Sequence, residues 1–363
     1  MKVGILTFPD SISYGAVLQM YALQTAVERL GHEAEVIHYH NAYMKAEKHI
    51  RKGQGTLRFV LQRAVRRWVH RPLYAAFAAF ERQNVRLHPA RAFSDRASLM
   101  RHGDVYDAVV CGSDQVWNPG ITDTDSSYFL DFCGDHTRRV AYAPSFGVEE
   151  LPSDVAQTIR PHLAAFDALS VREEAGRRLV QQVAERDAAV VVDPTLLLTA
   201  EDWMALERPH PAAVGEYIVY FTVRRSDALF ARCVAWAESH GMKMLVVGGN
   251  RRTADRNRHP LITYVPDIGP QEWLYLMHHA RYVVTNSFHG TAFSVIFGKD
   301  FFVEYPARTA SRLQQVVEGL GLDSRVVREG EPMTEAAAPY DGVAAALNGM
   351  RQESLAYLSA ALA

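Results

Sequence analysis

Short apolar runs alternate with longer amphipathic runs along most of this chain. The beginning of the chain shows the pattern clearly, because Lys2–Phe8 is predicted to be a buried strand, Ala16–Leu30 a helix and Glu33–Tyr39 the next strand. Gly31 lies where a glycine commonly ends a helix. Strands that alternate with helices are typical of a parallel sheet with crossover helices, so we expect an α/β fold.

Further strand candidates fall into two series on either side of the proline-rich stretch Glu207–Pro211, which resembles a linker. They are Ala108–Cys111, Arg139–Ala143, Ala168–Arg172 and Val190–Val192 in the first series, and Tyr217–Val223, Lys243–Val247, Thr263–Val265, Tyr282–Thr285 and Phe301–Tyr305 in the second. A chain of 363 residues fits two domains of ordinary size. We therefore predict two Rossmann-like lobes facing a central cleft, at 1–206 and 207–339, with a helix at 340–363 that packs back across them.

Composition excludes several classes of protein. With 39 basic and 41 acidic residues, the chain shows no global attraction for nucleic acid. No run approaches the roughly 20 apolar residues of a membrane helix, and Met1–Phe8 is too short for a signal peptide, so we expect a cytoplasmic protein. Cys111, Cys133 and Cys233 lack paired spacing, so we expect reduced core residues. Nothing in the sequence requires a metal, because the carboxylates are scattered, and no cofactor is expected.

The segment 45–96 is rich in Lys and Arg. Its part from Arg58 to Arg71 mixes arginines with apolar residues at helical spacing, which predicts a basic amphipathic helix. One interpretation is a surface for anionic lipid headgroups at the inner face of the membrane, or for the diphosphate of a lipid-linked substrate. The other is a helix whose arginines are solvated while its apolar side covers the sheet.

The segment 283–294 is an apolar strand followed by a polar turn and a helix, with His289 and Gly290 at the start of that helix. A parallel strand delivers its carboxyl end to the ligand-binding edge of a sheet, and the following helix N-terminus attracts anions. An imidazole there can donate a proton beside a bound phosphate or carboxylate. The alternative is a histidine that caps the helix or packs beneath the next turn.

Two further turns follow strands, at Tyr14–Gln19 and at Cys111–Asn118. In the second, Gly112 and Ser113 would let backbone amides approach a ligand. Neither turn matches the phosphate-binding loop of nucleotide triphosphatases or the dinucleotide glycine pattern, which disfavours nucleotide triphosphates and nicotinamide. Taken singly, each is also explained by an ordinary connection between a strand and a helix.

Six ordered segments together identify a family. They are Asp10–Gln19, Gly112–Asn118, Tyr142–Gly147, Ser170–Glu174, Asp193–Leu197 and Thr285–Thr291. In these segments the chain resembles the polysaccharide pyruvyl transferase family over nearly its whole length. The resemblance implies a fold similar to that of B-type glycosyltransferases. It also implies transfer of the pyruvyl group of phosphoenolpyruvate to two hydroxyls of a sugar, which forms a cyclic ketal and releases phosphate.

That reaction suggests roles for particular residues. His289 suits the general acid, and the helix that begins near Gly290 and Thr291 suits the phosphate. Arg172 is the candidate clamp for a carboxylate or phosphate, or else an ion-pair partner of Glu173, of Glu174 or of a residue across the lobes.

The base for a sugar hydroxyl is a second assignment. Asp114 is a candidate, Asp10 competes with it, and either could instead cap a helix. Some family members carry an arginine where this chain has Ser287, so another cation is expected, with Arg312 preferred over Arg308.

The remaining expectations concern binding. The predicted substrate-binding residues are Ser287, Gly290, Thr291, Arg312, Tyr14, Gln19, Ser113, Gln115 and Asn118, and Gly248–Asn250 is expected to border the same region. The partners are phosphoenolpyruvate and a saccharide acceptor, free or lipid-linked. Two rival functions stay open: a B-type glycosyltransferase that uses a sugar nucleotide, with Glu304 as its candidate ribose ligand, and a non-catalytic saccharide-binding protein of envelope assembly.

Overall fold

The computed structural model describes residues 1–41, 65, 68–93, 95–248, 259–305, 310–328, 331 and 333–363, without the side chains of 310–312. The chain forms two compact units, one of Met1–Leu197 with Met350–Ala363 and one of Leu198–Gly349. The expected boundaries were 206/207 and 339/340. The first boundary lies instead between Leu197 and Leu198. Trp203 already belongs to the second unit, because its ring packs edge-on against that of Phe293, with ring centroids 5.0 Å apart.

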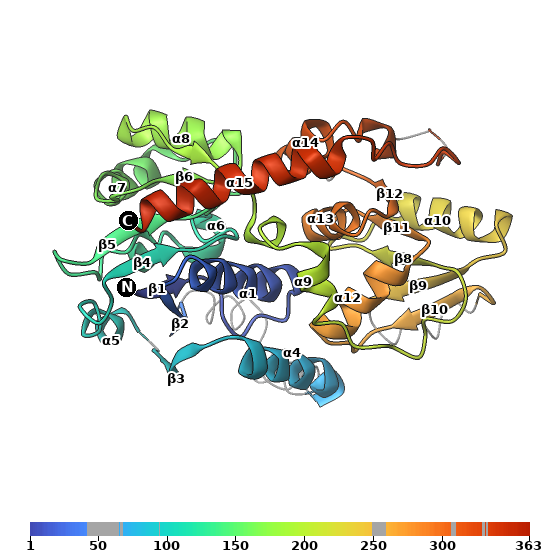
Figure 1. Ribbon diagram of the computed structural model, residues 1–363, viewed down its shortest axis with the longest axis horizontal. Helices are drawn as coiled ribbons and strands as arrows, with labels where there is room; N and C mark the ends of the chain where they lie inside the picture. Colours follow the sequence, from blue (N-terminus) through green and yellow to red (C-terminus); the bar gives the residue numbers. More distant parts are fainter. Residues whose placement is uncertain are drawn as a thin grey trace, which may run out of the picture. The chain divides into compact units, whose positions relative to one another are not determined.

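Unit 1 contains a parallel five-stranded sheet in the order β3-β2-β1-β4-β5 (Figure 1). Its strands are β1 (Lys2–Leu6), β2 (Glu33–Tyr39), β3 (Leu87–Phe93), β4 (Ala108–Cys111) and β5 (Arg138–Ala141). Its helices are α1 (Tyr14–Arg29), α4 (Arg71–Asn84), α5 (Arg96–Met100), α6 (Pro119–Thr122), α7 (Ser153–Ala164) and α8 (Glu174–Ala184), with short 3-10 turns at Ser126–Phe129 and Pro194–Leu196. Its core includes Trp117, whose ring stacks on Phe129.

Unit 2 repeats this topology, with a parallel sheet in the order β10-β9-β8-β11-β12. The strands are β8 (Tyr217–Phe221), β9 (Lys243–Val247), β10 (Ile262–Val265), β11 (Tyr282–Thr285) and β12 (Asp300–Val303). The helices are α9 (Ala200–Met204), α10 (Asp227–Ser239), α12 (Pro270–His279), α13 (Phe288–Ile296) and α14 (Ala310–Gly319), with a 3-10 turn at Asp323–Arg325. The predicted α/β class with two Rossmann-like sheets is therefore confirmed.

In both sheets the strand order reverses next to the first strand, between β1 and β4 in unit 1 and between β8 and β11 in unit 2. The strands on either side of each reversal end level with one another, since Leu6 pairs with Cys111 and Thr285 pairs with Phe221. Open α/β sheets bind ligands beyond the carboxyl ends of their strands at this point. The turns singled out from the sequence at 112–118 and 286–291 lie at these two switch points.

Two predicted strands of the first series belong elsewhere. Ala168–Arg172 and Val190–Val192 were expected as strands. The first contains β6 (Ser170–Val171), the second shares only Val190 with β7 (Ala189–Val190), and β6 and β7 form a separate two-stranded sheet. The strand β3 was not predicted from the sequence. This strand is at the edge of its sheet and contains Pro89, which removes one backbone donor and hides the usual strand pattern.

The last helix, α15 (Val343–Ala361), begins in unit 2 and ends in unit 1. Its final turns are attached to unit 1 by side chains. The Ser354 hydroxyl accepts a hydrogen bond from the Val192 amide (3.0 Å), and the Tyr357 hydroxyl donates to the Ala141 carbonyl (3.0 Å). These contacts explain why 350–363 joins a unit that is distant in sequence.

Three other expectations concern composition. The cysteines Cys111, Cys133 and Cys233 are buried and free, as predicted for core residues. Within the described residues, no helix combines the length and apolar character that a membrane span requires. Most of the predicted basic helix from Arg58 to Arg71 lies outside the described residues, so its surface role stays a prediction.

Candidate functional site

The turn after β11 is built by short hydrogen bonds between neighbouring strand ends. The Thr285 hydroxyl donates to the Phe221 carbonyl at 2.6 Å and accepts from the Ser287 amide at 3.0 Å. Ser287 is the N-cap of α13, and its side-chain oxygen accepts from the Gly290 amide at 3.3 Å. Ser287 therefore has a structural role at the start of this helix.

Gly290 and Thr291 shape the same turn. A Cβ at Gly290 would lie 2.3 Å from the Thr285 hydroxyl oxygen, so only glycine fits without a shift. Thr291 is buried, and both its amide and its hydroxyl donate to the Ser287 carbonyl (3.0 and 3.1 Å). The amides of both residues thus bond within the turn, and their predicted contact with phosphate stays a prediction.

His289 lies in the first turn of α13 and is half-buried. Its ring lies edge-on to Phe288, with centroids 5.1 Å apart. The position fits the predicted general acid, because it combines a helix N-terminus with the carboxyl end of β11.

Asn286, which the sequence analysis did not assign, connects this turn to the loop after β8. Its side-chain oxygen accepts from the Val223 amide (3.0 Å), and its side-chain nitrogen donates to the Arg224 carbonyl (2.8 Å). Glu304, the candidate ribose ligand of the rival function, follows β12 and accepts from the Ser226 hydroxyl at 3.0 Å. The signal for Asn286 was its place directly after a buried strand.

In unit 1, Ser113 and Gln19 are fully buried. The Ser113 hydroxyl donates to Asp193 (3.0 Å), while Gln19 donates to the Thr7 hydroxyl (2.9 Å), which in turn donates to the Ser113 carbonyl (3.0 Å). Tyr14 is also buried, and its ring packs on Phe77 of α4. Ser113 and Gln19 therefore support the loops after β1 and β4, whereas Tyr14 packs against α4. The predicted contact of all three residues with substrate stays untested.

Asp114 is half-buried and has a φ of 82°, a left-handed conformation that costs energy for a residue other than glycine. Its carboxylate accepts from the Gln115 amide at 2.8 Å, whereas the N-cap of α6 is Asn118. Asp114 thus does not cap that helix. Strained residues of this kind cluster at functional sites, which is compatible with the predicted base.

Gln115 and Asn118 join the loop after β4 to the loop after β5. The Asn118 side-chain amide donates to the Gln115 side-chain oxygen at 2.8 Å. Gly147, with a φ of 65°, lies so close that a Cβ there would be 2.2 Å from that same oxygen. The Ser145 amide also donates to the Asp114 carbonyl (2.9 Å). Hydrogen bonds within the predicted segment 113–118, and between it and the loop after β5, therefore hold its residues in place.

Arg172 lies beneath these loops, with only 3% of its side chain exposed. Its guanidinium donates to Asp193 at 2.9 Å and lies 3.5 Å from Glu173. Burial alone would lower its pKa, but the charges of Glu173 and Asp193 outweigh it, so the net pKa is raised. The ion pair with Glu173, predicted as the alternative to a substrate clamp, is present in the structure. Asp193 is a second partner, which was not predicted from the sequence. The clamp itself stays a prediction.

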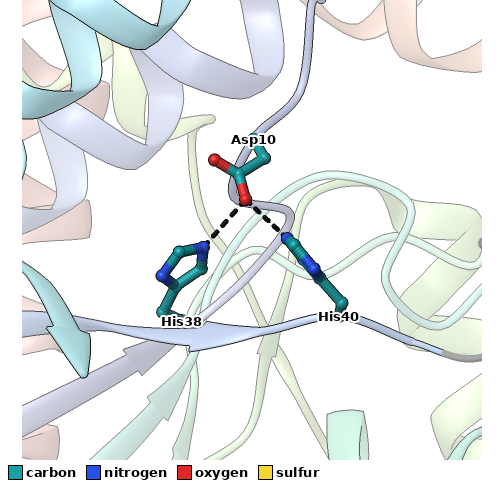
Figure 2. A group of neighbouring side chains, drawn as sticks. All are labelled: Asp10, His38 and His40. Carbon is teal, nitrogen blue, oxygen red and sulfur yellow. Dashed lines mark hydrogen bonds and ion pairs between the residues drawn. The ribbon is translucent and has the colours of Figure 1, made fainter. Parts of the chain in front are cut away.

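A cluster of titratable side chains, Asp10, His38 and His40, lies beyond the carboxyl ends of β1 and β2 (Figure 2). The Nε2 atoms of His38 and His40 approach the same oxygen, Oδ2 of Asp10, at 2.8 and 2.6 Å. These two contacts hold the pKa of Asp10 well below its usual range. Glu81 of α4 is buried beside Asp10, and burial together with the Asp10 charge raises its pKa to about 8. Asp10 was only a competing base in the sequence analysis, and the other three residues were missed.

Several predicted residues lie outside the described part of the chain. Gly249, Asn250, Arg308 and the side chain of Arg312 belong to this set. Gly248, the last described residue of that loop, follows β9 with a φ of 77°.

Solved structures confirm the fold. The UDP-GlcNAc 2-epimerase of Methanocaldococcus jannaschii aligns with a TM-score of 0.55 and 11% identity, covering 97% of this chain and 93% of that one. Anabaena Alr3699/HepE, solved with UDP-glucose, aligns with a TM-score of 0.55 and 12% identity, covering 100% of this chain and 94% of that one. At such low identity these similarities concern the fold, which is of the B type of glycosyltransferases.

Sequence comparison identifies the family. A search of curated proteins gives no match. The family model described as polysaccharide pyruvyl transferase matches residues 14–305, which include the loops at both switch points. This chain therefore belongs to the polysaccharide pyruvyl transferase family.

Proposed function

We propose that this protein transfers the pyruvyl group of phosphoenolpyruvate to two hydroxyls of a sugar in a polysaccharide or its lipid-linked precursor. The observation that carries the proposal is the family match over 14–305, together with His289 at the switch point of unit 2. No cofactor is part of the proposed reaction, because phosphoenolpyruvate is itself the activated donor.

The chemistry proceeds in two additions. A sugar hydroxyl adds to the central carbon of phosphoenolpyruvate while an acid protonates its methylene carbon, which becomes a methyl group. Phosphate then leaves with its bridging oxygen, and a second hydroxyl adds to the resulting oxocarbenium carbon and loses its proton. The products are a cyclic ketal and inorganic phosphate.

His289 is the proposed acid, and Asp114 is the proposed base for a sugar hydroxyl. The N-terminal position of His289 supports the first role, because the partial positive charge there favours an anionic donor nearby. The strained backbone of Asp114 supports the second. Buried Arg172 acts chiefly by holding Glu173 and Asp193, and through them the loops after β4 and β5.

Titration calorimetry of the full chain with phosphoenolpyruvate, and separately with UDP-glucose and UDP-GlcNAc, tests the donor. Saturable binding of phosphoenolpyruvate with silent nucleotides is the expected result. Binding of a nucleotide sugar with silent phosphoenolpyruvate would contradict the proposal and favour the B-type glycosyltransferase.

Phosphate release with a panel of free and lipid-linked sugars tests turnover. His289→Ala is expected to slow release by roughly 10²- to 10⁴-fold, the usual contribution of a general acid. His210→Ala, a half-buried histidine of the same unit, is the matched control and should retain the rate. Equal rates in His289→Ala and the unaltered protein would refute the assignment. Donor binding without turnover on any acceptor would instead favour the non-catalytic function.

A further inference from the structure

His38 and His40 present their imidazoles together because of strand geometry. Alternate residues of a strand point to the same face, so His38 and His40 share one face of the β2 end while Tyr39 points to the other. Tyr39 is in the hydrophobic core, and its hydroxyl donates to Asp125. The His40 amide still donates to the Phe93 carbonyl of β3, at 3.1 Å, so its backbone is fixed beyond the end of β2.

Asp10 completes a compact set of three ligand atoms. It lies in the loop after β1, the neighbour of β2 in the sheet, and its Oδ2 faces both imidazole nitrogens (Figure 2). The three atoms lie within 4.8 Å of one another. Tetrahedral zinc has ligand bonds of about 2.0–2.2 Å, which places its ligand atoms roughly 3.3–3.6 Å apart. The observed spacings of 2.8 and 2.6 Å have to widen by roughly 0.5–1 Å to admit an ion.

The orientation of His38 also favours a metal. Its other ring nitrogen, Nδ1, lies 3.1 Å from the Pro89 carbonyl, which can only accept a hydrogen bond. Nδ1 therefore carries a proton, and Nε2 is the atom directed at Asp10. A backbone carbonyl on the far nitrogen is the contact that commonly fixes the ring of a metal-binding histidine.

Glu81 adds a buried carboxyl group behind the set. Only 2% of Glu81 is exposed, and its carboxyl group lies within hydrogen-bonding reach of Asp10. Among the described residues, one of its oxygens, Oε1, has no hydrogen-bond partner. Carboxylate ligands of metals are usually held by such a second layer of polar groups.

A second group of similar composition, Glu207 with His278 and His279, has a different geometry. Its histidines are consecutive at the end of α12 and lie against different oxygens of Glu207, at 2.8 and 3.4 Å. The Lys299 ammonium also donates to the His278 carbonyl at 2.5 Å, so a cation is already close to this group. It serves as a matched control.

We propose that Asp10, His38 and His40 bind one divalent transition-metal ion of the zinc class. Two imidazole nitrogens and one carboxylate oxygen are the ligands, and three protein ligands leave a coordination position for water or a substrate oxygen. No metal was predicted from the sequence, and the proposed site does not depend on the donor being phosphoenolpyruvate.

The test uses the full chain without an affinity tag, freed of metal by EDTA and dialysed. Titration with Co²⁺, followed by visible absorption, should show one ion bound per chain, with ligand-field bands that added Zn²⁺ abolishes. His40→Ala and Asp10→Asn are expected to lose the bands. His278→Ala, from the control group, should keep them.

Thermal unfolding of each metal-free variant establishes that it is folded, and His40→Gln replaces His40→Ala if the latter is not. Absence of cobalt binding by the unaltered protein would overturn the proposal. Bands that persist in folded His40 and Asp10 variants, or that vanish in His278→Ala, would also overturn it.

Discussion

Replacing Glu81 by Gln should make the protein more stable at neutral pH. Glu81 is a buried carboxyl group next to Asp10, whose own pKa is strongly lowered by His38 and His40. In this group of four, Asp10 holds the negative charge and Glu81 stays protonated. An amide keeps the shape and the ability to donate a hydrogen bond to Asp10, but it has no proton to lose.

The size of the effect follows from the difference in pKa. The pKa of Glu81 rises from 4.5 to about 8 on folding. Between these values the folded state binds more protons than the unfolded state, so stability falls as the pH rises. The resulting loss is roughly 1 kcal/mol at pH 5 and roughly 3 kcal/mol at pH 7, at 1.36 kcal/mol for each pKa unit.

Urea unfolding at pH 5, 6, 7 and 8, followed by circular dichroism in the presence of EDTA, measures this difference. The free energy of unfolding of Glu81→Gln, relative to the unaltered protein, should increase by roughly 2 to 3 kcal/mol between pH 5 and pH 7. Glu353→Gln, at an exposed position of α15, is the matched control and should show no such trend.

A difference between Glu81→Gln and the unaltered protein that is constant with pH would refute the reasoning, since Glu81 would then be ionised in the folded state throughout. A difference that changes in the opposite direction would mean that folding lowers the pKa of Glu81.

Three other substitutions follow from the geometry. Gly290→Ala should lower the melting temperature, because overpacking costs about 1–3 kcal/mol of the free energy of unfolding. Gly349→Ala, in an open position of α15, should be neutral or stabilising. Equal effects of the two substitutions would contradict the close packing at Gly290. Asp114→Gly should raise stability by roughly 1 kcal/mol by relieving its positive φ and yet abolish phosphate release, and an active variant would exclude Asp114 as the base. Arg172→Met should lower the free energy of unfolding in urea by about 3–5 kcal/mol, because it leaves the buried carboxylates of Glu173 and Asp193 without their cation. A loss below about 1 kcal/mol would show that these two ion pairs contribute little to stability.

The sequence by itself determined the fold class, the main strands and the family. Buried parallel strands are short continuous apolar runs, so Lys2–Phe8 and Tyr282–Thr285 are readable without any contact information. The turn from Ser287 to Thr291 is also local, because an N-cap and a glycine are recognised within one helical turn. The family followed from six such local segments in order.

Tertiary structure decided what depends on strands that are adjacent in the sheet but distant in the chain. Arg172 has neighbouring Glu173 as a partner that sequence could suggest, but its closer partner Asp193 comes from beyond the next helix. Asp10 meets His38 and His40 only because β1 and β2 lie side by side in parallel, which brings their carboxyl ends to one edge. Local patterns encode which residues form a strand, whereas sheet order sets which strand ends share a site, and long-range packing fixes that order.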